Sequence, residues 1–146
     1  MVTKTIKINA PVKKVFYYIT NPDNWTRYVT SLVGVRNISS KSPETGTTFE
    51  WTYRMLGINF DGRGTVVEFL RDKKFAIEMD GSFPTRESYL FEGNSDSTML
   101  TIEINYEVHG RILCVLANRL VVEKLNKREA DAVLKKVKTI CETDNI

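Results

Sequence analysis

The stretch INAPVKKVFYYITNPDNW, residues 8–25, contains two prolines close together, directly after a strand-like start. Proline suits the first position of a helix, because the N–H group that it lacks would have no partner there. Pro11 is therefore expected to begin a short amphipathic helix. The apolar residues at helical spacing after it are Val12, Val15, Phe16 and Ile19.

The Asn21-Pro22 step repeats this arrangement. Proline disfavours a helical conformation in the residue before it, and asparagine is a good helix cap, so the first helix should end here and a second should begin at Pro22. The apolar residues at helical spacing in the second helix are Trp25, Tyr28, Val29 and Leu32. The stretch thus predicts two short helices joined by a corner.

Strand patterns lie on both sides of this corner. Residues 3–8 alternate between polar and apolar, and residues 33–108 show about six strand-like segments, which with the first give a sheet of about seven strands. Because short turns separate the segments, the sheet is expected to be an antiparallel meander. The turn signals lie at residues 42–46, 56–57, 71–74, 81–84 and 93–96.

Alternation within the strands predicts one apolar, covered face and one polar, exposed face. Polar residues such as Glu50, Arg63 and Glu78 fall on the exposed face. The residues predicted for the covered face are Phe49, Trp51, Tyr53, Met55, Ile58, Phe60, Val66, Phe75, Ile77, Met79, Tyr89, Phe91, Leu100, Ile102, Ile104 and Tyr106.

The segment from about residue 111 to 143 has no internal glycine or proline and predicts a long helix that covers the sheet. Its second half has a clear apolar stripe, whereas residues 112–117 are apolar nearly all round. Such a turn needs contacts on more than one side. Enclosure between sheet and loops is expected, and the alternatives are a dimer contact or a membrane-facing patch. The stripe consists of Ala130, Val133, Leu134, Val137, Ile140 and Cys141.

The composition is that of an ordinary globular chain. Its 146 residues are 42% hydrophobic and 27% charged, with a net charge of +3, so a single domain spanning residues 1–146 is expected. No leader pattern or membrane-length apolar run is present, which predicts a soluble cytoplasmic protein. The two cysteines, Cys114 and Cys141, are too far apart along one helix to bridge and are expected to be reduced.

Taken in order, these features resemble the START-like (SRPBCC) superfamily with its α+β helix-grip fold. The chain is most similar to the polyketide cyclase/dehydrase and coenzyme-Q-binding branch, over essentially its whole length. The short motifs that support the resemblance are Ile8-Asn9-Ala10-Pro11, Asn21-Pro22-Asp23-Asn24-Trp25, Gly64-Thr65-Val66-Val67-Glu68 and the closing helix.

This resemblance implies a cavity between a curved sheet and the long helix that accepts a lipid, quinone, sterol or polyketide. Aromatic side chains on the covered face suit such a cavity, since they offer apolar walls and phenol hydroxyls, although plain core packing would give the same alternation. The residues expected to line the cavity are Trp51, Tyr53, Phe60, Phe75, Ile77, Tyr89, Phe91, Ile102, Tyr106, Leu116 and Leu120.

Few residues suggest chemistry. His109 is the only histidine, so a Ser–His triad, a zinc site and the two-histidine iron site of the superfamily's oxygenases are not expected, and no metal or cofactor is predicted. The candidates for acid–base catalysis by strand parity are Glu87, Tyr53 and Tyr89, because a carboxyl in an apolar cavity would have a raised pKa and could exchange protons near neutral pH. The competing interpretation places Glu87 in solvent at an edge or cavity mouth.

Three functions therefore remain open. The leading one is binding or carriage of a hydrophobic small molecule without catalysis, and the second is a metal-free cyclase or aromatase. The third is an accessory protein that contacts a membrane or a protein through residues 112–117 or the basic side of the long helix. Nucleic-acid binding is not expected, because acidic residues interrupt the basic ones. The basic residues are Lys124, Lys127, Arg128, Lys135, Lys136 and Lys138, and the acidic ones are Glu123, Glu129 and Asp131.

Overall fold

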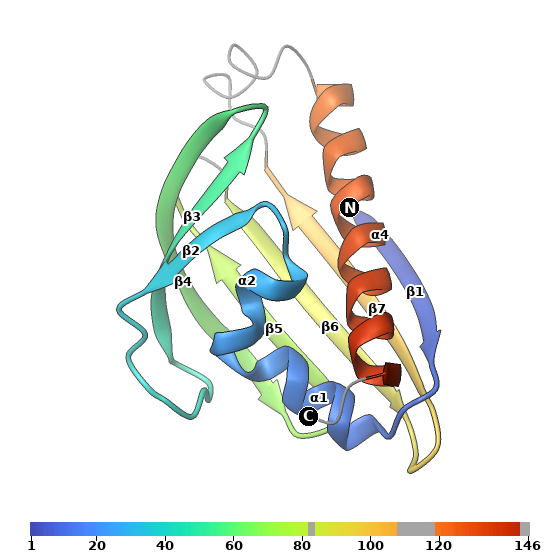
Figure 1. Cartoon of the computed structure of the whole chain (residues 1–146). Helices are drawn as coiled ribbons and strands as arrows, with labels where there is room; N and C mark the ends of the chain where they lie inside the picture. Colours follow the sequence, from blue (N-terminus) through green and yellow to red (C-terminus); the bar gives the residue numbers. More distant parts are fainter. Residues whose placement is uncertain (82–83, 108–118, 144–146) are drawn as a thin grey trace.

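The computed structural model describes residues 1–81, 84–107 and 119–143. Its core is a seven-stranded antiparallel sheet with the strand order β1-β7-β6-β5-β4-β3-β2 (Figure 1). The predicted meander is thereby confirmed, with β1 added beside β7. The strands are β1 (Val2–Ile8), β2 (Leu32–Arg36), β3 (Thr48–Met55), β4 (Ile58–Leu70), β5 (Lys74–Met79), β6 (Thr85–Gly93) and β7 (Thr98–Tyr106).

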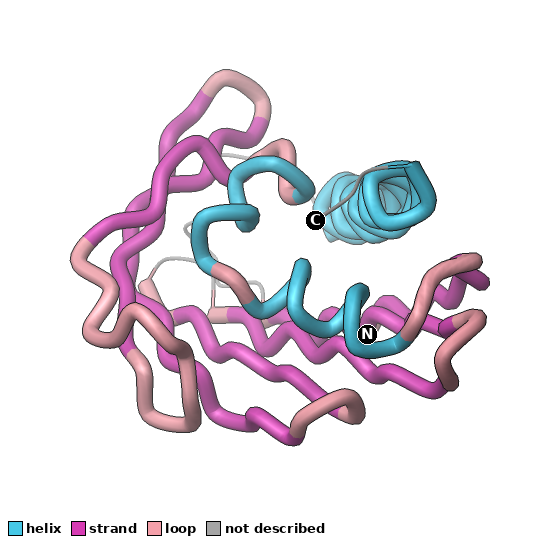
Figure 2. Tube along the Cα trace, turned by 60° about the horizontal axis from the view of Figure 1, so that its bottom comes forward, coloured by secondary structure: helices cyan, strands magenta, loops and turns pink. Residues whose placement is uncertain are grey.

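The sheet is strongly curved, and the helices lie on its concave side (Figure 2). The pairing register shifts between Val66 and Glu68 on β4 and between Leu32 and Gly34 on β2. Such irregularities increase the local twist and bend of a strand, so they help a long strand such as β4 to follow the curve. The curved sheet and long helix confirm the helix-grip prediction.

The corner after β1 consists of α1 (Val12–Thr20), the 3-10 helix η1 (Pro22–Asn24) and α2 (Trp25–Tyr28). Asn21 caps η1 as predicted, with its side chain accepting from the N–H of Asp23 at 3.1 Å. Two boundaries differ from the prediction. Pro11 precedes the first helix as its cap residue, and the second helix stops at Tyr28, because Leu32 already pairs with Tyr53 in the sheet.

Side chains of this corner bind the carbonyl groups at the end of α1. The last carbonyls of a helix have no partner within it. Here the indole N–H of Trp25 and the hydroxyl of Tyr28 both donate to the carbonyl of Ile19, at 2.9 and 2.7 Å. The side chain of Asn24 donates to the carbonyl of Tyr18 at 3.0 Å. The motif NPDNW therefore fixes how the two helices meet.

The long helix α4 (Arg119–Thr143) lies across the sheet and packs mainly against β1, with further contacts to β7, α1 and α2. Near its end the ammonium group of Lys138 donates to Glu142 and to the carbonyl of Lys7, both at 2.7 Å. Glu142 also accepts from the N–H of Asn9 at 2.7 Å. These bonds hold the C-terminal half of α4 at the β1 edge. Residues 112–117, predicted as its first half, lie outside the described residues.

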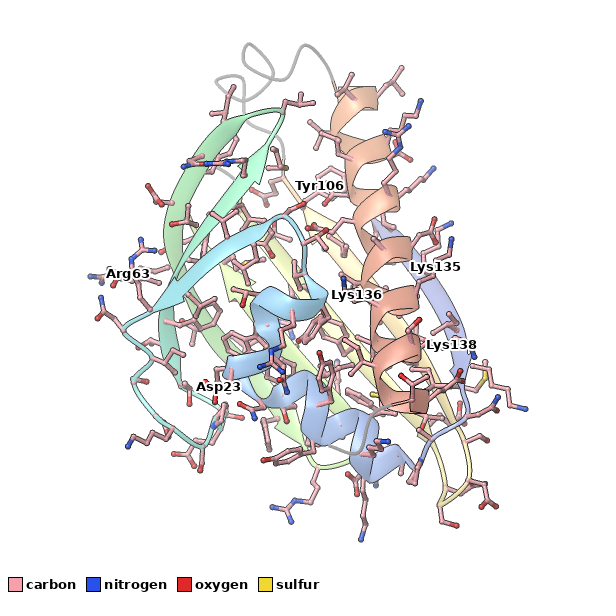
Figure 3. All side chains as sticks on the ribbon, viewed as in Figure 1. Asp23, Arg63, Tyr106, Lys135, Lys136 and Lys138 are labelled. Atoms are coloured by element: carbon pink, nitrogen blue, oxygen red, sulfur yellow. The ribbon has the colours of Figure 1, made fainter. Side chains whose placement is uncertain are left out.

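Most of the predicted covered face is buried, but five residues differ, of which Met55, Phe60 and Ile77 are half-buried. Ile58 is 40% exposed, because it begins β4 at the outer end of the β3–β4 hairpin. Tyr106 is half-buried at the end of β7 (Figure 3). On α4 the predicted stripe from Ala130 to Cys141 is buried, except for Ile140, which is half-buried. None of the described helices has the length and apolar character needed to cross a membrane.

Candidate functional site

Two adjoining pockets lie inside the fold, where the curved half of the sheet faces α2 and α4. They share Trp51, Tyr53, Met79 and Glu87. The first pocket extends toward α4 and is completed by Met55, Phe60, Thr85, Ile104, Asn126 and Glu129. The second extends toward α2 and is completed by Trp25, Tyr28, Val29, Leu32, Phe49, Phe75, Ile77 and Tyr89.

Two aromatic walls of these pockets depend on glycines of the neighbouring strand. Trp51 on β3 pairs with Gly62 on β4, and Phe49 pairs with Gly64. A Cβ atom at residue 62 would lie 2.3 Å from the Trp51 ring, and one at residue 64 would lie 2.2 Å from the Phe49 ring. The glycines thus let both rings lie across β4, since a glycine in a strand permits the close approach of another group.

Glu87 on β6 is the central polar group of the site. It is only 4% exposed, and its Oε1 accepts a hydrogen bond of 2.5 Å from the hydroxyl of Tyr89. Burial raises the pKa of Glu87, and the hydrogen bond from Tyr89 partly opposes this by favouring the charged form. The interpretation of Glu87 as a solvated edge residue is therefore wrong.

Glu129 on α4 brings a second carboxyl to the first pocket. The residue as a whole is half-buried, but its Oε1 is out of contact with solvent and has no hydrogen-bond partner among the residues that the structure describes. Burial, followed by the negative charge of Glu87, raises the pKa of Glu129 to about 7, while a hydrogen bond with Ser31 acts in the opposite direction. The two carboxyls are thus close enough to influence each other.

Neighbouring polar groups complete the site. Trp51 is 2% exposed, yet its indole Nε1 has no hydrogen-bond partner within the part of the chain that the structure describes. The amide of Asn126 donates through Nδ2 to the carbonyl of Val122 at 3.0 Å, which leaves Oδ1 as its acceptor. Burial raises the pKa of Tyr53 well above its usual value, so its phenol stays protonated at neutral pH. The same holds for Tyr28 and Tyr89.

The structure brings together six of the predicted lining residues and places others elsewhere. Trp51, Tyr53, Phe60, Phe75, Ile77 and Tyr89 line the two pockets. Phe91 packs instead against Phe16 at a ring distance of 5.0 Å, and Ile102 is fully buried in the core.

The remaining three predicted residues do not line these pockets in the described structure. Tyr106 lies in a separate groove at the end of β7. Leu120 is 76% exposed near the start of α4, so the expectation that it faces the interior is wrong. Leu116 lies outside the described residues, as does His109.

Two polar residues of the first pocket, Glu129 and Asn126, were not predicted from the sequence. Glu129 was grouped with the charged residues of the outer side of the helix, and Asn126 was not assigned to either side. The buried stripe of α4 contains Val133, Val137 and Cys141, at intervals of four. Continued toward the N-terminus in steps of four, three and four, it passes through residues 129, 126 and 122. This periodicity could have identified both polar residues as inward-facing.

Both pockets are small. The first encloses about 30 Å³ and the second about 20 Å³. A single water needs roughly 10–15 Å³ measured in this way, and sites for drug-sized ligands enclose about 300–1,000 Å³. The interior therefore has room for only one or two water molecules per pocket in this conformation. Among the described residues, no cluster of three or more His, Cys, Asp or Glu side chains could hold a metal ion.

Comparison with known families identifies the chain at the level of its family. Residues 1–142 match the family described as polyketide cyclase / dehydrase and lipid transport, and the protein belongs to this family. No curated protein sequence matches the chain.

Solved structures show the same fold at low sequence identity. TTHA0849 from Thermus thermophilus has a TM-score of 0.78 at 17% identity, with 94% of each chain covered. The Zhui aromatase/cyclase from a Streptomyces species has a TM-score of 0.76 at 13% identity, covering 97% of this chain and 92% of that one. A START superfamily protein from Mycobacterium smegmatis has a TM-score of 0.73 at 14% identity, with coverages of 97% and 96%.

Proposed function

We propose that this protein binds a hydrophobic small molecule in the interior between the concave face of the sheet and α4. The observation that supports this is the presence of two buried polar atoms, Trp51 Nε1 and Glu129 Oε1, on residues that line the same pocket. Neither atom has a hydrogen-bond partner among the described residues. Most buried polar groups are hydrogen-bonded, so such atoms beside aromatic walls suit the polar group of a ligand. Membership of a family that includes lipid transport agrees with this proposal.

Because the pockets are small, a ligand has to enlarge them. The first pocket is bounded by Met55 and Phe60 near the outer end of the β3–β4 hairpin and by Asn126 and Glu129 on α4. Helix α4 is anchored mainly on β1, which lies at the opposite edge of the sheet from β3 and β2. We expect ligand entry to separate the β3–β4 hairpin from the N-terminal half of α4.

Nile red, a neutral dye that fluoresces in apolar surroundings, tests this proposal. We expect saturable binding at one site per chain, and native mass spectrometry of the purified protein should show bound apolar molecules. The substitution Met55→Ala, in the pocket wall, should change the affinity at least threefold. The matched control Leu120→Ala truncates an exposed apolar side chain and should leave the affinity unchanged. No saturable binding and no copurified molecule would contradict the proposal.

A second candidate function is proton transfer on a bound carbonyl compound, as in a metal-free cyclase. The observation that favours it is the placement of Glu87 and Glu129 in one aromatic pocket, with the pKa of Glu129 raised to about 7. A carboxyl of this kind can act as a general base near neutral pH. The test is hydrogen–deuterium exchange at the methyl group of 2-acetylnaphthalene, followed by NMR.

Catalysis predicts that Glu129→Gln or Glu87→Gln slows this exchange at least tenfold without unfolding the protein or preventing binding. Exchange at the rate of buffer alone, although the ketone binds, would leave binding as the function and exclude this proton transfer.

A further inference from the structure

We infer that the ligand of this pocket presents a hydrogen-bond donor, a hydroxyl or a protonated amine, to the interior and carries no carboxylate. The inference rests on the proposed function and specifies the class of its ligand. It is based on the charges and hydrogen-bond partners of the polar side chains that line the first pocket.

The two side chains of this pocket wall that can be charged near neutral pH are both acidic, while Trp51, Tyr53 and Thr85 contribute hydrogen-bond donors. The pocket contains the carboxyls of Glu87 and Glu129 and the amide of Asn126, whose Oδ1 is its remaining acceptor. Glu87 accepts from Tyr89, whereas Oε1 of Glu129 has no partner in the described ranges of the chain. No lysine, arginine or histidine is among the described residues of the pocket wall. A donor on the ligand would therefore meet a free acceptor.

A carboxylate would enter an unfavourable environment. Buried charges need a partner of opposite sign, and like charges at short range repel more strongly where water is excluded. The raised pKa of Glu129, caused by burial and by the charge of Glu87, agrees with this argument.

The net charge of +3 does not offset this local effect. Lys135 and Lys136 lie on exposed positions of α4 (Figure 3), where water screens their charge.

The two kinds of donor would use the pocket differently. A hydroxyl can donate to Glu129 and also accept from the N–H of Trp51. Since neither atom has a partner among the described residues, one hydroxyl could satisfy both. A protonated amine can only donate, but it would neutralise the carboxyls and lie against the rings of Trp51, Tyr53 and Phe60. Both groups share the donor that the inference requires, and a matched series of probes separates them.

The experiment compares 2-naphthalenemethanol, 2-naphthylmethylamine and 2-naphthoate by calorimetric titration of the full chain at pH 8. The three probes share one ring system and differ mainly in the polar group. We expect the alcohol or the amine to bind at least tenfold more tightly than the carboxylate, and the tighter of the two identifies the donor.

The substitution Glu129→Gln should reduce this preference at least fivefold. Glu123→Gln, which changes a partly exposed carboxyl on the same helix, should not alter it. Glu87→Gln provides a second variant if Glu129→Gln does not fold.

Equal or tighter binding of 2-naphthoate by the native chain would overturn the inference and leave the proposed function intact. The inference also fails if none of the three probes binds while Nile red does. If Nile red and all three probes fail to bind, the proposed function itself is wrong. An unchanged preference in both Gln variants would show that the carboxyls do not select the ligand, which again overturns the inference.

Discussion

The hydroxyl of Tyr89 donates a hydrogen bond of 2.5 Å to Oε1 of Glu87, two positions earlier on the same strand. Residues two apart on a strand point to the same face, so β6 directs both groups into the interior. The ring of Tyr89 also stacks on Phe75, with 6.2 Å between the ring centroids. A core aromatic thus positions the hydroxyl that supports the buried carboxyl.

Removing this hydroxyl with Tyr89→Phe should raise the pKa of Glu87 further, because the hydrogen bond favours the charged carboxylate. The free energy of unfolding should fall by about 1–2 kcal/mol. A ¹³C NMR titration of the glutamate carboxyls measures the first effect, and urea denaturation measures the second. Tyr17→Phe, at a residue that is 64% exposed, is the control. An unchanged or lower pKa of Glu87 in Tyr89→Phe would contradict the assigned contact.

Glu129 should make the stability of the protein depend on pH. Its pKa is raised to about 7 in the folded state, so between its ordinary value and 7 the folded chain binds more protons than the unfolded chain. The stabilising proton is present at low pH and is lost as the pH rises through 7. The resulting decrease in the free energy of unfolding should reach roughly 2–3 kcal/mol by pH 8.

The substitution Glu129→Gln removes this titrating group, so its stability should fall less than that of the native protein between pH 5 and 8. Chemical denaturation at several pH values gives the comparison. Glu123→Gln should follow the native curve, because the side chain of Glu123 is partly exposed and pairs with Lys127 on the surface of α4. If the free energy of unfolding of Glu129→Gln falls with pH as steeply as that of the native protein, the carboxyl of Glu129 does not titrate in a buried position.

Gly62→Ala and Gly64→Ala should each reduce the free energy of unfolding by about 1–3 kcal/mol, because the new Cβ atom would overlap an aromatic ring. Gly62→Ala should also change the fluorescence of Trp51, since the clash involves its indole. Gly34→Ala is the matched control on another strand, where a Cβ atom would meet nothing within 4 Å. Equal stability of all three variants would argue against the close approach of ring and backbone.

Trp25 and Tyr28 should show coupled effects on stability, because both donate to the carbonyl of Ile19. In Trp25→Phe or Tyr28→Phe the carbonyl keeps one donor, whereas the double variant leaves it buried and unpaired. The double variant should therefore lose more stability than the sum of the two single variants, by about 1 kcal/mol. If the stability losses of the two single variants add up to that of the double variant, Trp25 and Tyr28 do not share the carbonyl of Ile19 as an acceptor.

The sequence predicted much of the fold, because helix and strand periods and the two prolines near the N-terminus are local signals. It overestimated the second helix, since Leu32 fits a helical stripe but pairs with Tyr53 in the sheet. It also did not determine which inward-facing aromatics surround a pocket. Phe91 and Tyr89 have the same parity on β6, yet only Tyr89 lines a pocket, because Phe16 covers Phe91.

The polar part of the site was harder to predict, because it joins residues far apart in the chain. Strand parity placed Glu87 beside Tyr89, but burial could not be deduced from parity. Because basic residues surround Glu129 in the sequence, it was interpreted as part of the exposed side of the helix, although its position continues the buried stripe of α4. The meeting of these two carboxyls depends on how α4 packs over the sheet, and no local pattern encodes that contact.

The most direct test of ligand binding in the interior uses the two tryptophans, which give two indole N–H signals in a ¹H–¹⁵N spectrum. The Nε1 of Trp25 is bonded to Ile19, whereas that of Trp51 has no partner in the described structure. On titration with 2-naphthalenemethanol, the Trp51 signal should move markedly and more than that of Trp25. If neither signal moves at saturating probe, or if Trp25 alone responds, the ligand does not occupy the pocket at Trp51 and the central claim is wrong.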